Sequence, residues 1–155
     1  MKTPWMSKKE EQAASEELAA DGGFAEQEFY NWCDANDIDR STEGMNEDEA
    51  RSFEKIKKAF TKAITEKRLI VDGSSFMYTI SDRSPGAGNT LTVRTPTGRA
   101  WTALGEAKSG NDVQRIQFFI ASICGVEKKD IAQITGLVMK DYKVLLGAAT
   151  LFLTE

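Results

Sequence analysis

The side chains in this sequence that could do chemistry are mainly carboxylates and lysines, because the chain contains no histidine. Histidine is the commonest general base near neutral pH and the commonest metal ligand, so serine triads and histidine zinc sites are excluded. Three carboxylate pairs are close in sequence: Glu16/Glu17, Glu26/Glu28 and Asp37/Asp39. All three lie in hydrophilic surroundings without an apolar pocket to raise a pKa. We interpret them as solvated faces and predict no catalytic residues and no enzyme activity.

An enzyme that works through carboxylates and lysines alone is the competing interpretation. It would need a deep cleft lined by two carboxylates with raised pKa values. The sequence offers no set of polar residues that predicts such a pocket.

Two segments are similar in composition to ligand-binding loops, but neither has the residue spacing that such a loop needs. The glycine-rich loop from Ser84 to Thr90 lacks the Gly-Lys-Ser/Thr ending of a phosphate-binding loop and leads into a predicted strand. A calcium loop beginning at Asp37 would have Thr42 where glycine must turn and Asp48 where a bidentate glutamate is needed. We therefore expect no cofactor and no metal ion.

The cysteines and the charge balance exclude some kinds of site and of partner. Cys33 and Cys124 form neither a CxxC pair nor a zinc spacing, so we expect two small buried side chains and no disulfide. Residues 1–66 hold 9 Lys and Arg against 16 Asp and Glu, whereas residues 67–155 hold 11 against 8. This balance, without a Lys/Arg run, is too weak for tight binding to a phosphate backbone, so nucleic acid is not an expected partner.

No apolar stretch approaches the roughly 20 residues that span a bilayer, and the first residues lack the apolar core of a signal peptide. We expect no membrane contact and a cytoplasmic location.

Residues 1–66 are predicted to form an acidic helical region. Residues 7–20 can form a helix that buries almost nothing, so we expect a solvated arm. The run from Phe24 to Cys33 places apolar residues on one helical stripe. Asn46 and Glu49 form a capping box that begins a further helix, with Phe53, Ile56 and Phe60 on one face.

Residues 67–155 are predicted to form a second domain, a β-meander with a helical bundle. Strands are expected at 69–71, 76–80 and 90–94, with a turn at Asp72-Gly73. Helices are expected at 99–108, 112–124, 127–134 and 139–153. The predicted fold class is α+β: a three-stranded antiparallel meander packed against C-terminal helices and preceded by the acidic helical region.

Two groups of apolar residues each allow two interpretations. Phe29 and Trp32 either pack on the Phe53/Ile56/Phe60 face as a helical hairpin or form a partner-binding patch. The last helix is apolar on more than one side, so it is either deeply buried or shared with a partner or a second copy of the chain. A homo-oligomer is therefore one of the expected arrangements.

The order of elements in residues 69–153 resembles the phage tail assembly chaperone family. The likeness rests on the strand 90–94 followed by Pro96 and a helix with Trp101, on an apolar helix that ends at Gly125, and on the segments 129–134 and 139–145, the latter with Asp141-Tyr142 followed by Leu145. Residues 1–66 have no counterpart in this resemblance.

The resemblance implies a non-enzymatic phage or prophage protein that covers apolar helices of the tape-measure protein during tail assembly, which would protect them from aggregation. The predicted partner-binding residues are Tyr142, Leu145, Leu146, Leu151, Phe152, Ile116, Phe119, Ile120, Phe29 and Trp32. The alternative for each residue is a place in the core. The alternative function is a small cytosolic adaptor whose acidic N-terminal helices dock a basic partner.

Overall fold

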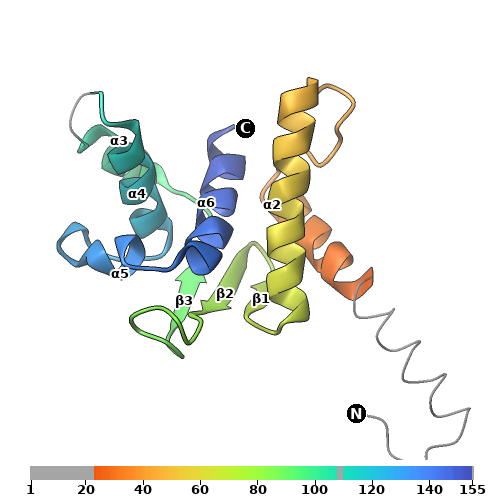
Figure 1. Ribbon diagram of the computed structural model, residues 1–155. Coiled ribbons are helices and arrows are strands. Elements are labelled where there is room, and N and C mark those ends of the chain that lie inside the picture. Colours follow the sequence, from red (N-terminus) through yellow and green to blue (C-terminus); the bar gives the residue numbers. More distant parts are fainter. Residues whose placement is uncertain (1–22, 108–109, 155) are drawn as a thin grey trace, which may run out of the picture.

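The computed structural model describes residues 23–107 and 110–154, and the predicted arm at residues 7–20 lies outside this part of the chain. Helices and one small antiparallel sheet make up the fold, which confirms the predicted α+β class (Figure 1). The sheet lies below the helices in this view, with α2 on one side, α6 in the middle and α3 and α4 on the other. Among the described helices, none is long and apolar enough to cross a membrane.

A helix at residues 23–35 and α2 (Glu47–Thr65) form the N-terminal part of the described chain. Asn46 caps α2 as predicted, because its side chain accepts a hydrogen bond from the Glu49 backbone N–H at 2.9 Å. Three acidic residues in the first turn suit the positive end of the helix dipole. Helix α2 ends at Thr65, two residues before Lys67, which adopts a φ of 62°.

Strands β1 (Leu69–Asp72), β2 (Ser75–Thr79) and β3 (Thr90–Val93) pair in the order β1-β2-β3, as the meander prediction requires. Gly73 and Ser74 connect β1 and β2, and Gly73 has a φ of 62°, a conformation that favours glycine in a two-residue hairpin loop. Strand alternation places one set of side chains toward the helices: Leu69, Phe76, Tyr78, Leu91 and Val93, all buried.

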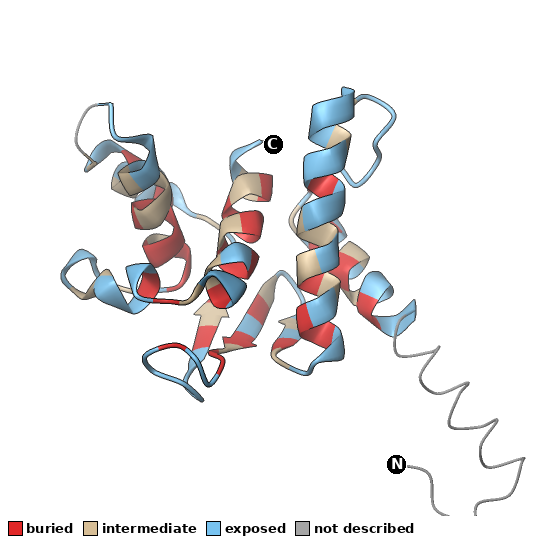
Figure 2. Ribbon diagram, viewed as in Figure 1, coloured by how far each residue is buried: buried red, intermediate tan, exposed pale blue. Residues whose placement is uncertain are grey.

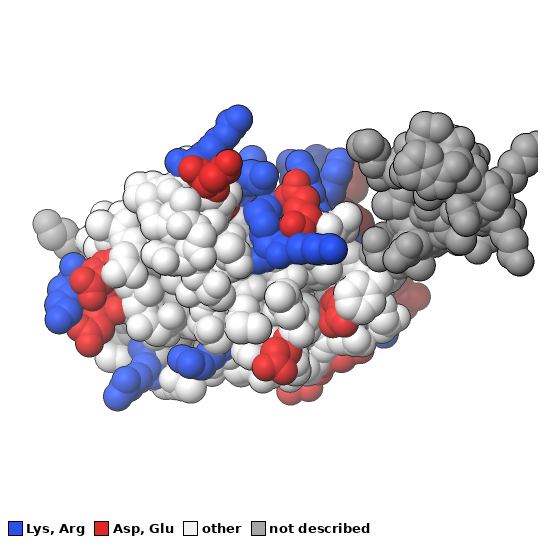
Figure 3. All heavy atoms as spheres, turned by 90° about the horizontal axis from the view of Figure 1, so that it is seen from below, with Lys and Arg blue, Asp and Glu red and all other residues white. Residues whose placement is uncertain are grey.

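The opposite face of the sheet stays exposed. Ile70 pairs with Met77 across β1 and β2, and both side chains are solvent-exposed. Figure 3 views the molecule from the end at which the strands lie in Figure 1. Most of the surface seen from this end is uncharged.

The C-terminal helices cover the inner face of the sheet. They are α3 (Gly98–Gly105), α4 (Asp112–Ile123), the 3₁₀ turn η1 (Lys128–Asp130), α5 (Ala132–Thr135) and α6 (Met139–Leu153). The bounds of α6 match the prediction, whereas the short helix expected at 127–134 is divided into η1 and α5.

One hydrophobic cluster contains residues from both predicted regions (Figure 2). Trp32 is fully buried and lies with its ring centroid 4.9 Å from that of Phe60, 5.6 Å from Phe76 and 5.4 Å from Phe152. The indole therefore joins the helix at 23–35 to α2, β2 and α6. Edge-to-face and tilted aromatic pairs at such distances stabilise a core beyond the area they bury.

Candidate protein-binding site

The most deeply buried charge in the described chain belongs to Asp141 in the first turn of α6, with 0% of its surface exposed. Its carboxylate accepts hydrogen bonds from the Tyr78 hydroxyl at 2.5 Å, the Ser81 hydroxyl at 2.8 Å and the Ser84 hydroxyl at 2.5 Å. Arg68 donates to the Tyr78 hydroxyl and lies 3.8 Å from Asp141 Oδ1. These contacts tie the end of β2 and the following loop to the start of α6.

The pKa values in this network follow from burial and hydrogen bonding. Burial alone would raise the pKa of the Asp141 carboxyl, but donation from Ser84, Tyr78 and Ser81 outweighs it and holds the pKa below its usual value. Burial, together with donation to Asp141, raises the pKa of the Tyr78 hydroxyl. Because no solvent reaches Asp141, this arrangement fits an internal anchor better than a site that contacts a substrate.

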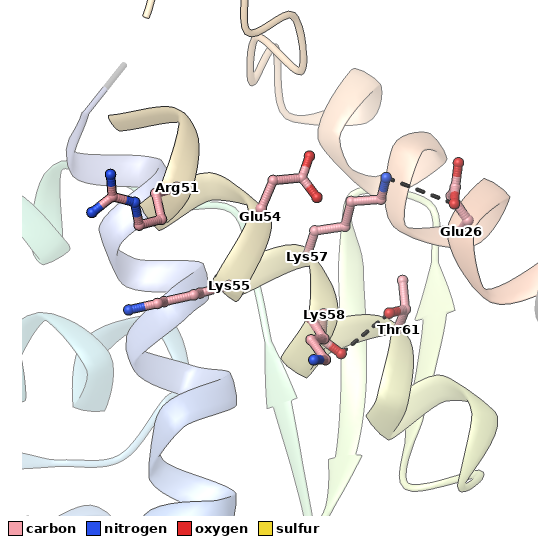
Figure 4. A pocket seen from close by; sticks show the side chains of 7 residues that line it. All are labelled: Glu26, Arg51, Glu54, Lys55, Lys57, Lys58 and Thr61. Atoms are coloured by element: carbon pink, nitrogen blue, oxygen red, sulfur yellow. Dashed lines mark hydrogen bonds and ion pairs between the residues drawn. The ribbon is translucent and has the colours of Figure 1, made fainter. Parts of the chain in front are cut away.

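A surface pocket of about 400 Å³ lies beside α2, and it is lined by both acidic and basic side chains (Figure 4). Lys57 points toward the helix at 23–35, where its Nζ lies 3.7 Å from Glu26 Oε2 and donates to the Tyr30 hydroxyl at 2.7 Å. The hydrogen bond to Tyr30, opposed by partial burial and helped by Glu26, raises the pKa of Lys57. Lys57 thus fastens two helices together.

A second surface is a groove between α2 and α6, which we call the α2/α6 groove. One half has a volume of about 460 Å³, and its residues are Ser52, Lys55, Ile56, Lys58, Ala59, Lys62, Lys143, Leu146, Gly147 and Thr150. Ile56, Ala59 and Leu146 are each partly exposed there. At Gly147 the helices approach so closely that a Cβ would lie 3.0 Å from Ile56 Cγ2. The groove floor is therefore apolar and formed by two packed helices.

Four lysines lie at the rim of this apolar floor. Lys55, Lys58, Lys62 and Lys143 line this half, and no aspartate or glutamate does. Within residues 23–107 and 110–154, the observed ion pairs involve other cations. Figure 4 shows Lys55 extending away from Lys57 and Glu26, toward the α6 side of α2. Apolar floor and cationic rim together suit a partner segment with an apolar face and acidic flanks.

The structure separates the sequence-predicted binding residues into two groups. Six are buried in the core: Leu145, Leu151, Phe119, Ile120, Phe29 and Trp32. For Phe29 and Trp32 the helical-hairpin interpretation is confirmed: the Phe29 ring lies 5.8 Å from Phe53 and 5.0 Å from Phe60 in tilted and edge-on arrangements, and Trp32 lies 4.9 Å from Phe60. The remaining four are partly buried against the core: Tyr142, Leu146, Phe152 and Ile116.

These six side chains have little or no exposed surface in this conformation, so a part for them in partner binding stays a prediction. Physically, the small sheet and short helices leave few aliphatics for the core, so the aromatic and leucine side chains must fill it. Of the ten, only Leu146 and Leu151 line the α2/α6 groove.

Sequence reasoning missed both the Asp141 anchor and the lysine rim. Asp141, Val144, Leu145 and Ala148 share one helical stripe, so the spacing places a carboxylate on the buried face of α6. Lys55, Lys58 and Lys62 recur every three or four residues beside Ile56 and Ala59, a spacing that places these cations along one side of the helix next to apolar residues.

In the described part of the chain, no group of three or more cysteines and carboxylates is placed to hold a metal ion. Comparison of the chain with protein-family models, curated proteins and solved structures gave no match.

Proposed function

We propose that the protein is a phage or prophage tail assembly chaperone, a non-enzymatic protein that holds apolar helices of the tape-measure protein in its α2/α6 groove. The single observation that carries the proposal is the apolar floor of Ile56, Ala59 and Leu146 with lysines at its rim. A groove between two packed helices accepts a third helix by the same side-chain interdigitation that packs the first two.

The side chains of the groove are suited to reversible binding of a partner helix, which we call the client. Its floor is partly exposed, so a bound apolar face would remove water from both surfaces. Lysines keep the empty groove hydrated and discourage self-association of exposed apolar residues. The order of elements in residues 69–153 supplies the link to tail assembly, because it resembles that of the chaperone family.

Co-expression with the long, helix-rich protein encoded just downstream tests this proposal. We expect the two proteins to co-elute in size-exclusion chromatography and the partner to stay soluble. Leu146→Asp and Ile56→Asp should abolish co-elution under conditions in which circular dichroism shows that each variant is still folded. Leu145 is unsuitable for this test because it is fully buried.

Val113→Asp provides the matched control, since Val113 is an apolar residue 65% exposed on α4 and outside the groove. It should leave co-elution unchanged. Co-elution that survives both groove substitutions would overturn the proposal. If charge reversal at Glu28 and Asp34 then abolished co-elution, an adaptor that uses its acidic N-terminal helices would explain the binding.

A further inference from the structure

The α2/α6 groove continues beyond its lysine-lined half. A neighbouring hollow of about 610 Å³ shares Ser52, Ile56 and Thr150 with the first half and extends it toward the start of α2 and the end of α6. The two helices run in opposite directions (Figure 1). From Glu49 to Lys62 the groove follows α2 for roughly 20 Å at a rise of about 1.5 Å per residue.

The two halves of the groove carry opposite charges. Asp39 and Glu49 line the second half, and no lysine or arginine does. Glu47 and Asp48 lie in the same first turn of α2, where Asp48 Oδ1 is 3.7 Å from Arg51 Nη1. The first half is lined by lysines and by no carboxylate. The shared uncharged middle, with Ile56 on α2 and Thr150 on α6, separates the two ends.

The opposite charges at the two ends restrict which kind of molecule the groove can bind. A nucleic acid or an anionic membrane surface carries one sign of charge and would meet repulsion at the acidic end. A helix of uniform charge would likewise satisfy one end and oppose the other. A helix with an apolar stripe and opposite charges at its two ends complements the whole length of the groove.

We propose, building on the proposed function, that the groove fixes the direction of its client: the bound helix places acidic side chains between Lys62 and Lys143 and basic side chains beside Asp39 and Glu49. The apolar stripe of the client then lies on Ile56 and Leu146. Natural helices are enriched in acidic residues in the first turn and in basic residues in the last. Such a helix would run parallel to α6.

Three synthetic 15-residue helical peptides with the same leucine stripe test the proposal by fluorescence anisotropy with the full chain. One carries glutamates in its first turn and lysines in its last, one carries glutamates at both ends, and one carries lysines at both ends. We expect the bipolar peptide to bind at least about tenfold more tightly than either of the others, a ratio that corresponds to about 1.4 kcal/mol.

A nitroxide spin label on the acidic end of the bipolar peptide tests direction. It should broaden the amide signals around Lys62 and Lys143 and leave those around Glu49 sharp. In the variant Lys58→Glu/Lys62→Glu/Glu49→Lys the broadening should move to the opposite end, whereas the control Lys129→Glu, on the exposed turn η1, should change nothing. Circular dichroism verifies that each variant is folded.

Equal broadening at both ends, or equal affinity of the acidic and bipolar peptides, would overturn the inference and leave the proposed function standing. If none of the three peptides binds while the tape-measure partner still co-elutes, the inference on direction is refuted and the proposed function is not. If no peptide binds and the partner does not co-elute, the proposed function itself is refuted. Dimerisation of the unbound chain, detected by sedimentation and lost on Leu146→Asp, would assign the groove to a second copy and refute the inference.

Discussion

At the scale of single residues, Asp141 shows how a buried charge can be stabilised without a close ion pair. Three hydroxyl donors surround the carboxylate, while the nearest guanidinium nitrogen of Arg68 is 3.8 Å away. Ser84 also accepts a hydrogen bond from the Val138 backbone N–H at 2.9 Å, just before α6 begins. The network thus helps to begin the helix as well as to satisfy the charge.

Replacing Asp141 with Asn should destabilise the protein by about 2–3 kcal/mol at pH 7, because charge-assisted hydrogen bonds are lost and an amide N–H₂ faces hydroxyl donors. The folded-state pKa of Asp141 is depressed, so its contribution exists above the unfolded pKa of about 3.9 and disappears as pH falls through the folded value. The difference between wild type and variant should therefore shrink below about pH 4.

Urea unfolding at a series of pH values measures this difference. Asp82→Asn is the matched control, since Asp82 is exposed in the loop that follows β2 and should change stability by less than about 0.5 kcal/mol. A difference between wild type and Asp141→Asn that stays constant from pH 7 to pH 3 would contradict the linkage to Asp141.

At the scale of elements, the junction between α2 and β1 contains a residue in an unfavourable conformation. Lys67 adopts a φ of 62°, and the backbone N–H of Arg68 donates to the Ala63 carbonyl at 2.9 Å, which closes the helix C-terminus. Glycine is the residue usually found there, because a Cβ is disfavoured in the left-handed region. This junction sets the angle at which α2 meets the sheet.

Lys67→Gly should stabilise the protein by about 0.5–1 kcal/mol, because relief of the left-handed conformation exceeds the extra freedom of glycine in the unfolded chain. Thermal unfolding should show a higher melting temperature. The contrasting variant Lys62→Gly, inside α2, should cost about 1 kcal/mol. A fall in stability on Lys67→Gly would show that the lysine side chain contributes more than its backbone costs.

Sequence periodicity was sufficient to predict the helices and strands. It was insufficient to predict which of their faces pack together and which remain exposed. The capping box at Asn46, the meander and the bounds of α6 follow from local pattern, since caps, turns and alternation depend on neighbouring residues. Which side of α6 meets α2 depends on the close approach at Gly147, a contact between distant segments. The groove therefore could not be assigned from sequence, and the sequence left open which leucines of α6 are buried.

At the scale of the whole molecule, residues 23–66 share one hydrophobic cluster with the sheet and the C-terminal helices. Trp32 contacts aromatic rings of three other elements. Because neither part could keep this core closed alone, unfolding should occur in one cooperative step.

Urea unfolding of a Trp5→Phe/Trp101→Phe variant tests this cooperativity, since its fluorescence would come from Trp32 alone. Midpoints from fluorescence and from far-ultraviolet circular dichroism should coincide. Trp101 is 74% exposed, so its replacement should change stability little. Two separate midpoints would show that the N-terminal helices unfold independently, as the sequence-based division at residue 66 supposes.

The contact between Trp32 and Phe152 also bears on synthesis of the chain at the ribosome. Strands β1, β2 and β3 pair with their neighbours in sequence and can associate as soon as they have emerged. The Trp32 indole, by contrast, obtains its Phe152 neighbour only after α6 has been translated. A nascent chain therefore exposes part of its aromatic surface until α6 has been translated, and this part of the core closes only after that helix arrives.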